Sequence, residues 1–323
     1  MSNSSKTQKI MAISPHVEMW VRRMYRSKLG LSLLKNNLRT KKKLVATNSS
    51  IDLKSIKSYL RSIGIKKGDI MIVHSAFGSF KNSGLSPDDI IDFLIDIVGD
   101  QGTLVMPVIR KYPESPTVEE ALDADVSDIE FTYDVKKSQI WTGIIPKTLM
   151  NKPGSTTSKF PINTITAFGP ESGKMIQGEL EGDSPTPNGV NSSWKYCTDQ
   201  DAWVVSLGVD LTHSLTMIHT AEDVKNELWP IKGWYRKKKF KIIDGEQVTF
   251  KTILERHPKW GMLHFGERTL CKNLIDDKIM RSSVVEGVLI ESLKSKSLFD
   301  YLNSKNKNGY PYFWVKKDLD KWF

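Results

Sequence analysis

The chain has 323 residues, of which 39% are hydrophobic and 26% are charged, so it can bury a large core and keep a charged surface. No apolar run approaches the roughly 20 residues of a membrane-spanning helix, and the N-terminus lacks the apolar stretch of a secretory signal. Its two cysteines, Cys197 and Cys271, form no Cys-x-x-Cys pair. We therefore expect a cytoplasmic protein without a structural zinc site.

The net charge of +10 comes entirely from the N-terminal end. Residues 1–45 hold eleven Lys or Arg and one acid, Glu18, so the rest of the chain is neutral. A neutral body gives no support for a nucleic-acid-binding core, and we expect no nucleic-acid partner.

Residues 1–50 are predicted to form a basic helical arm and a linker. Apolar residues with helical spacing occur twice in it, first at Val17, Trp20, Val21 and Met24, then at Leu29, Leu31, Leu33 and Leu34. The first stripe is expected to pack on the body or on a second subunit of a homo-oligomer. The alternative is that it lies on an anionic membrane surface.

The body, residues 51–323, opens with an alternation of helix and strand that predicts a layered α/β sheet. We expect a helix over residues 53–63, ended by Gly64, and a buried strand over residues 69–73. A second helix starts at Ser86-Pro87-Asp88-Asp89, which supplies a capping hydroxyl, a proline and two acids, and it runs to Val98. A second buried strand follows at residues 103–106.

Later segments continue the pattern. Strands are expected at residues 164–168 and 202–207, a hairpin at 234–243 and 247–253, and a closing helix at roughly 285–302. Residues 114–134 hold eight acids and no base, and we interpret them as a long surface loop with at most one helical turn.

The segment Thr216-Met217-Ile218-His219-Thr220-Ala221-Glu222 contains a first candidate site. At a helix start, His219 and Glu222 would lie on one face, one turn apart. His-x-x-Glu is also half of a metal site, but zinc needs at least three protein ligands and His213 is not on that face. A structural histidine is the third interpretation.

Two further candidates follow predicted strands. Glu255 can orient a histidine so that its other ring nitrogen acts as a base, or it can simply pair with Arg256. His74-Ser75-Ala76-Phe77 follows a buried strand and can offer backbone N–H groups to a ligand. The sequence contains no dinucleotide, Walker or Gly-x-Ser-x-Gly motif.

The order and spacing of these segments resemble the aminoglycoside 3-N-acetyltransferase family. Gly64–Val108 is similar to the opening of that family, and Val205–Val209 followed by Thr216–Glu222 is the most specific match. Shorter blocks also match, at Phe131–Asp134, Thr142–Ile144, Ser158–Pro161, Thr166–Pro170, Ser184-Pro185, Ile253–Glu255 and Glu286–Val288. The resemblance covers roughly residues 53–302 and leaves the arm outside.

The resemblance implies a layered α/β/α fold with a central mixed sheet and direct transfer of an acetyl group from acetyl-CoA to an amine, without an acyl-enzyme. It places the general base on His219 and the acid that orients it on Glu255. Residues implied to bind the cofactor are His74, Ser75, Ala76, Phe77, Ser158, Lys159 and Phe160, with the His74-Ser75-Ala76 loop as the source of N–H donors to the thioester oxygen. Residues implied to bind the acceptor are Glu222, His257, Thr216 and Asp134, and no metal is implied.

The expected acceptor is a small-molecule amino sugar. Phe160 and Thr157 stand where the family usually has histidine and arginine, and His257 stands where some relatives have an acid. Lys232 and the basic run Arg236–Lys239, with Lys241, would suit a nucleotide diphosphate, whereas the acidic loop would suit a polycation. We predict a nucleotide-linked amino sugar of surface-polysaccharide synthesis. The alternatives are an aminoglycoside, with antibiotic resistance as the function, and an inactive membrane- or nucleic-acid-associated binding module.

Overall fold

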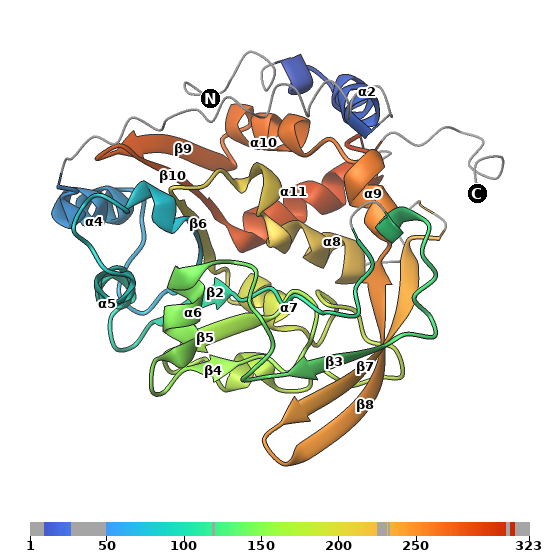
Figure 1. Ribbon diagram of the computed structural model, residues 1–323. Helices are drawn as coiled ribbons and strands as arrows, with labels where there is room; N and C mark the ends of the chain where they lie inside the picture. Colours follow the sequence, from blue (N-terminus) through green and yellow to red (C-terminus); the bar gives the residue numbers. More distant parts are fainter. Residues whose placement is uncertain are drawn as a thin grey trace.

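A seven-stranded mixed sheet forms the centre of the fold (Figure 1) in a computed structural model that describes residues 10–26, 50–117, 120–224, 231, 233–307 and 311–313. The strands, in spatial order, are β4 (Thr156–Thr157), β5 (Ile165–Phe168), β2 (Thr103–Pro107), β1 (Ile70–Ser75), β6 (Trp203–Leu207), β10 (Val288–Lys294) and β9 (Met280–Val285). β1 is parallel to β2 and β6, whereas β5 and β10 run antiparallel to their neighbours. The carboxyl ends of three neighbouring strands therefore lie at one edge.

Helices cover both faces of this sheet (Figure 1). One face packs on α4 (Leu53–Ser62), α5 (Pro87–Val98) and α6 (Ile144–Asn151), and the other on α7 (Ser193–Asp199), α10 (Glu267–Asp276) and α11 (Ser295–Lys307). Side chains alternate along β1, so Met71 and Val73 join the apolar cluster on the first face, and Ile70 and Ile72 join the cluster on the second. The predicted α/β/α fold with a central mixed sheet is confirmed.

A smaller three-stranded sheet lies beside the main one, in the order β3 (Glu130–Asp134), β7 (Tyr235–Asp244) and β8 (Gln247–Arg256). The predicted hairpin forms β7 and β8. The acidic segment contains one short helical turn, η2 (Glu120–Leu122), but it ends in β3 rather than in a loop. The strand forms because Phe131 and Tyr133 alternate with polar residues and bury their rings against Tyr112 and Phe240.

The ends of several elements follow the sequence signals. Asp52 caps α4, and Ser86 and Asp89 form a capping box at the start of α5. The closing helix expected at 285–302 is wrong, because β9 and β10 form a hairpin there and α11 begins only at Ser295. Its turn residues, Glu286 and Gly287, have φ angles of 52° and 73°, as a tight two-residue hairpin turn requires.

Helix α2 (Pro15–Arg26) of the arm packs on α9 (Pro258–Leu263) and α10 (Figure 1), as expected for docking on the body. The buried face differs from the predicted stripe. Met19 is fully buried, whereas Trp20 and Met24 are 60% and 51% exposed. The second apolar set of the arm and the linker lie outside the described residues. Within the described part of the chain, every helix is too short or too polar to cross a bilayer.

Candidate active site

The carboxyl ends of β1, β2 and β6 border a cavity of about 460 Å³, here called the sheet-edge cavity. Ser75 ends β1, Pro107 ends β2, and Val209 lies just beyond β6. Trp141 and Thr142 come from the loop before α6 and line the same space. Ligands bind at this edge of an α/β sheet because the loops there present backbone and side-chain polar groups that form no hydrogen bonds within the sheet.

The carboxyl end of β1 supplies unsatisfied polar groups to the sheet-edge cavity. His74 Nε2 and the Ser75 hydroxyl are buried and have no hydrogen-bond partner among the described residues. Burial lowers the pKa of His74 to about 4, so its ring is neutral at pH 7. One predicted N–H donor is not available, because Ala76 N donates to Leu207 O at 3.0 Å.

Close approach of two loops fixes this corner. Gly208 has a φ of 76°, and an added Cβ would lie 2.3 Å from Ser79 Oγ and 3.2 Å from Ala76 O. Ser79 Oγ also donates to Gly208 O at 3.1 Å. A side chain at Gly208 would therefore separate the loop after β1 from the loop after β6.

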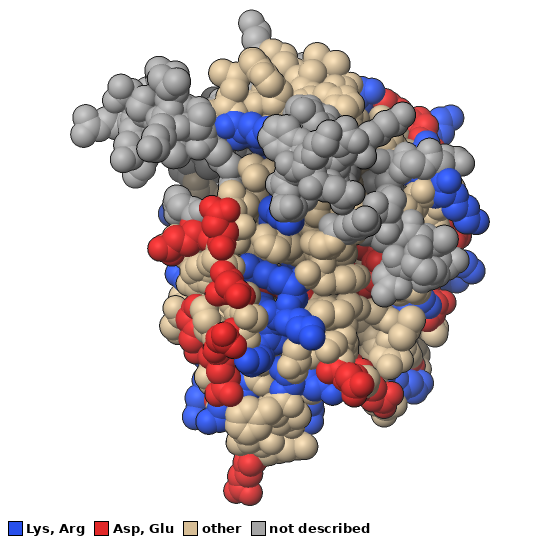
Figure 2. Space-filling model, turned by 90° about the vertical axis from the view of Figure 1, so that its right-hand side faces the viewer, with Lys and Arg blue, Asp and Glu red and all other residues tan. Residues whose placement is uncertain are grey.

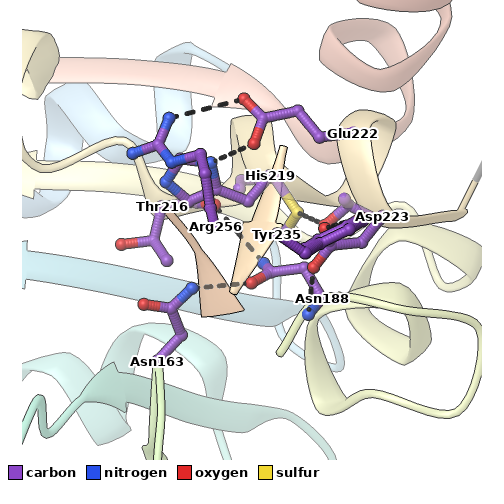
Figure 3. A network of polar contacts seen from close by, with 10 residues as sticks. Asn163, Asn188, Thr216, His219, Glu222, Asp223, Tyr235 and Arg256 are labelled. Atoms are coloured by element: carbon purple, nitrogen blue, oxygen red, sulfur yellow. Dashed lines mark hydrogen bonds and ion pairs between the residues drawn. The ribbon is translucent and has the colours of Figure 1, made fainter. Parts of the chain in front are cut away.

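His219 begins α8 (His219–Val224), directly after the single turn η5 (Thr216–Ile218). Its Nδ1 lies 2.7 Å from Glu222 Oε2, and Arg256 NH1 lies 3.7 Å from Glu222 Oε1 (Figure 3). The Glu222 side chain is only 1% exposed. A carboxylate on Nδ1 retains the ring proton there, which leaves Nε2 free to accept another.

The charges around His219 keep it neutral but able to take a proton. Burial, followed by the Arg256 charge, lowers its pKa, while the charges of Glu222 and Glu267 act in the opposite direction. Although burial favours the protonated form of Glu222, His219 and Arg256 hold its pKa below the usual value. An ionised carboxylate thus faces a neutral imidazole, the arrangement that a general base requires.

A second cavity, here called the histidine cavity, has a volume of about 100 Å³ and is lined by His219, Arg256 and Glu267. Ser214 and Thr216 line both this cavity and the sheet-edge cavity. The imidazole therefore faces a space that adjoins the carboxyl edge of the parallel strands.

A buried polar network holds the segment that carries His219 (Figure 3). Asn188 Nδ2 donates to Thr216 O at 3.4 Å, and Asn163 Nδ2 donates to Asn188 Oδ1 at 2.7 Å. Asp223 accepts from Asn188 N at 2.9 Å and from the Tyr235 hydroxyl at 2.7 Å, and burial raises its pKa to about 7. These contacts fix the backbone on both sides of the imidazole.

Glu255 was expected to contact His219, but the structure does not bring these two side chains together. Arg236 Nε donates to Glu255 Oε2 at 2.8 Å, and Lys238 Nζ lies 3.6 Å from Glu255 Oε1. Side chains alternate along β8, so Glu255 meets β7 while the next residue, Arg256, meets Glu222. The carboxylate that contacts the histidine is Glu222, one turn away on the same helix.

The residues predicted to bind the cofactor separate into two groups. His74, Ser75, Ala76 and Phe77 line the sheet-edge cavity. Ser158, Lys159 and Phe160 do not line it. Ser158 Oγ donates to the buried Glu179 at 2.9 Å, Lys159 Nζ pairs with Asp244 at 2.7 Å, and the Phe160 ring is buried in the aromatic cluster beneath the small sheet.

The residues predicted to bind the acceptor also divide. Thr216 lines both cavities, and Glu222 contacts His219. His257 instead caps α9, where its ring accepts from Lys259 N at 3.3 Å. Asp134 caps a turn after β3 by accepting from Lys136 N and Lys137 N, both at 2.9 Å. The structure places neither His257 nor Asp134 on the wall of either cavity.

Three of the five basic residues of strand β7 lie beside acids. Arg236 pairs with Glu255, and Lys239 Nζ lies 3.2 Å from Asp128 Oδ1 in the acidic segment. Lys238 is buried, 4.0 Å from the centre of the Phe131 ring. Figure 2 shows Lys and Arg side chains along this face with Asp and Glu side chains beside them. Lys232 lies outside the described residues.

Two charged residues of the site, Arg256 and Glu267, were not among the predicted site residues. Arg256 was considered only as a partner for Glu255, although strand alternation in β8 places the two on opposite sides. Glu267, the first residue of α10, carried no motif and is identified only by its position in the fold. Within the described part of the chain, no cluster of three or more His, Cys, Asp or Glu could hold a metal ion.

Residues 72–304 match the family model described as aminoglycoside 3-N-acetyltransferase. Among curated proteins, the chain is 25% identical to aminoglycoside N(3)-acetyltransferase IX of Micromonospora chalcea over 219 residues, which is 60% of this chain and 73% of that protein. It is 26% identical to aminoglycoside N(3)-acetyltransferase VIII of Streptomyces fradiae over 172 residues, which is 50% of this chain and 57% of that protein.

Solved structures share the fold. AAC-IIIb in a binary complex with CoASH has a TM-score of 0.66 and 18% identity, covering 80% of this chain and 97% of that one. AAC-VIa bound to sisomicin has a TM-score of 0.61 and 16% identity, covering 80% and 99%.

Proposed function

The chain belongs to the aminoglycoside 3-N-acetyltransferase family, and we propose that it transfers the acetyl group of acetyl-CoA to an amine of an aminoglycoside, with His219 as the general base. The observation that carries this proposal is the His219–Glu222 contact of 2.7 Å, with His219 on the wall of the histidine cavity, which shares Ser214 and Thr216 with the sheet-edge cavity. We assign the sheet-edge cavity to the acyl donor and the histidine cavity to the amine.

The nucleotide-linked amino sugar expected from the sequence, with its place in polysaccharide synthesis, is wrong. The family match and both named relatives are aminoglycoside acetyltransferases. Several residues that favoured a nucleotide have roles in the fold, because Arg236 and Lys239 pair with acids and His257 caps a helix. Phe160 fills the aromatic core of the small sheet.

The sheet-edge cavity fits the acyl donor. Acetyl-CoA supplies an acetyl group activated as a thioester, whose oxygen gains negative charge during attack. The Ser75 hydroxyl is buried on the cavity wall with no partner among the described residues, so it can donate to that oxygen. Phe77, Ile109 and Trp141 provide apolar surface in the same cavity for the neighbouring carbon chain of the donor.

On the acceptor side, His219 removes a proton from the attacking amine. Nε2 is the accepting atom because Nδ1 is held by Glu222. The Glu222 carboxylate stabilises the imidazolium that forms, and Arg256 keeps that carboxylate ionised.

Transfer is direct, without an acetylated cysteine. Cys271 lines the histidine cavity. Burial raises the pKa of Cys271, and it raises the pKa of Cys197 to about 12, so both thiols stay protonated at pH 7. A protonated, buried thiol is a poor nucleophile.

Three further expectations from the sequence remain predictions. They are the homo-oligomer, the peripheral membrane contact of the arm and the cytoplasmic location.

The test is thiol release from acetyl-CoA with kanamycin as acceptor, for wild type and His219→Ala. Removal of a general base is expected to reduce kcat by about 10²–10⁴-fold. Intact-protein mass after incubation with acetyl-CoA alone should show no added acetyl group. Near-wild-type turnover by His219→Ala, or a stable acetyl group on Cys271, would contradict the mechanism.

A further inference from the structure

A row of alternating charges connects the N-terminal helix to the histidine cavity. Arg22 NH2 on α2 lies 2.8 Å from Glu18 Oε1 and 2.9 Å from Glu267 Oε2, and NH1 donates to Gly261 O at 2.9 Å. Glu18 is fully buried. Three acceptors therefore hold the guanidinium in one place, and one of them belongs to the wall of the cavity.

Helix α2 is held tightly at this point. Glu18 Oε2 accepts from Arg268 N at 3.1 Å, and Met19 is fully buried. An added Cβ on Gly266 would lie 2.8 Å from Pro15 Cβ, so α2 rests directly on the residue before α10. These contacts belong to the arm, which lies outside the matched residues 72–304.

Glu267 links the arm to the site, because it contacts Arg22 of α2 and also lines the histidine cavity. It lines the histidine cavity together with His219 and Arg256. The negative charge of Glu267 raises the pKa of His219, whereas the positive charge of Arg256 lowers it. Both effects are consistent with the two charged groups lying close to the imidazole ring. A cation in this cavity is attracted by Glu267 and repelled by Arg256.

Size and charge indicate which part of an acceptor fits. A cavity of about 100 Å³ admits an amine-bearing end of a molecule rather than a whole sugar ring. Glu267 shares Arg22 with Glu18, since the guanidinium lies 2.9 Å from Glu267 Oε2 and 2.8 Å from Glu18 Oε1. An acceptor with several ammonium groups can place one beside Glu267 while another, deprotonated, faces His219.

We propose that α2 completes the acceptor site, with Arg22 as a positioning residue that holds the Glu267 carboxylate where it binds an ammonium group of the acceptor. This inference rests on the proposed function, since it assumes an amine acceptor in the histidine cavity. It assigns the arm a role in acceptor binding, in addition to its packing on the body.

The experiment measures KM for kanamycin and for acetyl-CoA in Arg22→Met, Glu267→Gln and the double variant. Arg23→Ala is the matched control, because it removes the same charge from an exposed position on the same helix. Loss of a charged hydrogen bond should raise KM for kanamycin by roughly 10- to 100-fold in each single variant. KM for acetyl-CoA should not change, and the double variant should be no worse than Glu267→Gln.

A second acceptor separates binding from folding. With a sugar that carries a single amine, Arg22→Met should raise the acceptor KM far less than it does with kanamycin, because no second ammonium group is present to contact Glu267. If Arg22→Met behaves like Arg23→Ala, or raises both KM values together with a lower Tm, the inference is wrong and Arg22 only anchors the helix. Turnover retained by His219→Ala would instead defeat the proposed function, whatever the arm variants do.

Discussion

Two glutamates have different kinds of partner. One lies in the segment that carries His219, and the other lies in the β7–β8 hairpin. Glu222 on α8 contacts an imidazole at 2.7 Å and is buried. Glu255 on β8 contacts Arg236 at 2.8 Å and Lys238 at 3.6 Å. Both are glutamates in the matched part of the chain, and both were candidates for a place in the site.

The difference lies in where the negative charge acts. At Glu222 it raises the proton affinity of a ring that can exchange a proton with a substrate. At Glu255 the charge acts on Arg236 and Lys238, which belong to the neighbouring strand, so it stabilises the hairpin. The nearest partner, more than the sequence motif, therefore decides which acid belongs to the chemistry.

The largest effect on turnover is expected when each of these two acids is replaced by glutamine in a separate variant. Glu222→Gln should reduce kcat by at least about 10²-fold, since the amide neither fixes the ring proton on Nδ1 nor stabilises the imidazolium. Glu255→Gln should keep turnover within a few-fold of wild type. Thiol release at saturating acetyl-CoA and kanamycin measures both. The reverse ranking would return the orienting role to Glu255.

A smaller effect is expected in the pH dependence of kcat/KM. The base must be neutral, so activity falls as pH drops through the pKa of His219, which burial and Arg256 hold below its usual value. The charged groups around the ring are Glu222, Arg256 and Glu267. Arg256→Met removes a lowering influence, so the acidic limb should move to higher pH.

Glu267→Gln is the counterpart, because it removes a raising influence and should move the same limb to lower pH. Both profiles are measured with the same acceptor, so the titration of its amines is common to them. Limbs that shift in the same direction, or not at all, would mean that another group controls the acidic side.

Local signals predicted much of the fold. The cap of α5 and the buried strand β1 depend on neighbouring residues, which the sequence contains. The hairpin of β9 and β10 was mistaken for a helix, because a short apolar run fits both periods and only Glu286 and Gly287 in positive φ distinguish them. The position of the sheet-edge cavity depends on the order of the strands in the sheet, which patterns in a single sequence do not contain.

The site was predicted in part for the same reason. His219 and Glu222 are three residues apart, so their contact follows from helix geometry alone. The contact of Arg256 with Glu222 spans two distant segments, and that of Arg22 with Glu267 joins the arm to the body. Contacts of this range depend on how helices and sheets pack, and the family resemblance alone pointed to Glu255 rather than to its neighbour Arg256 in β8.

The smallest effect concerns stability, and it tests whether Glu255 is a structural residue. Lys238 is buried against the Phe131 ring, and burial lowers its pKa, so its charge depends on Glu255 for compensation. Glu255→Gln should lower the free energy of unfolding by about 1–3 kcal/mol. Lys239→Ala is the control on the same strand, because its partner Asp128 has a side chain that is 96% exposed and such pairs contribute little. Urea denaturation followed by tryptophan fluorescence measures both variants. An unchanged free energy of unfolding in Glu255→Gln, with turnover also unchanged, would show that neither the base nor the hairpin depends on this carboxylate.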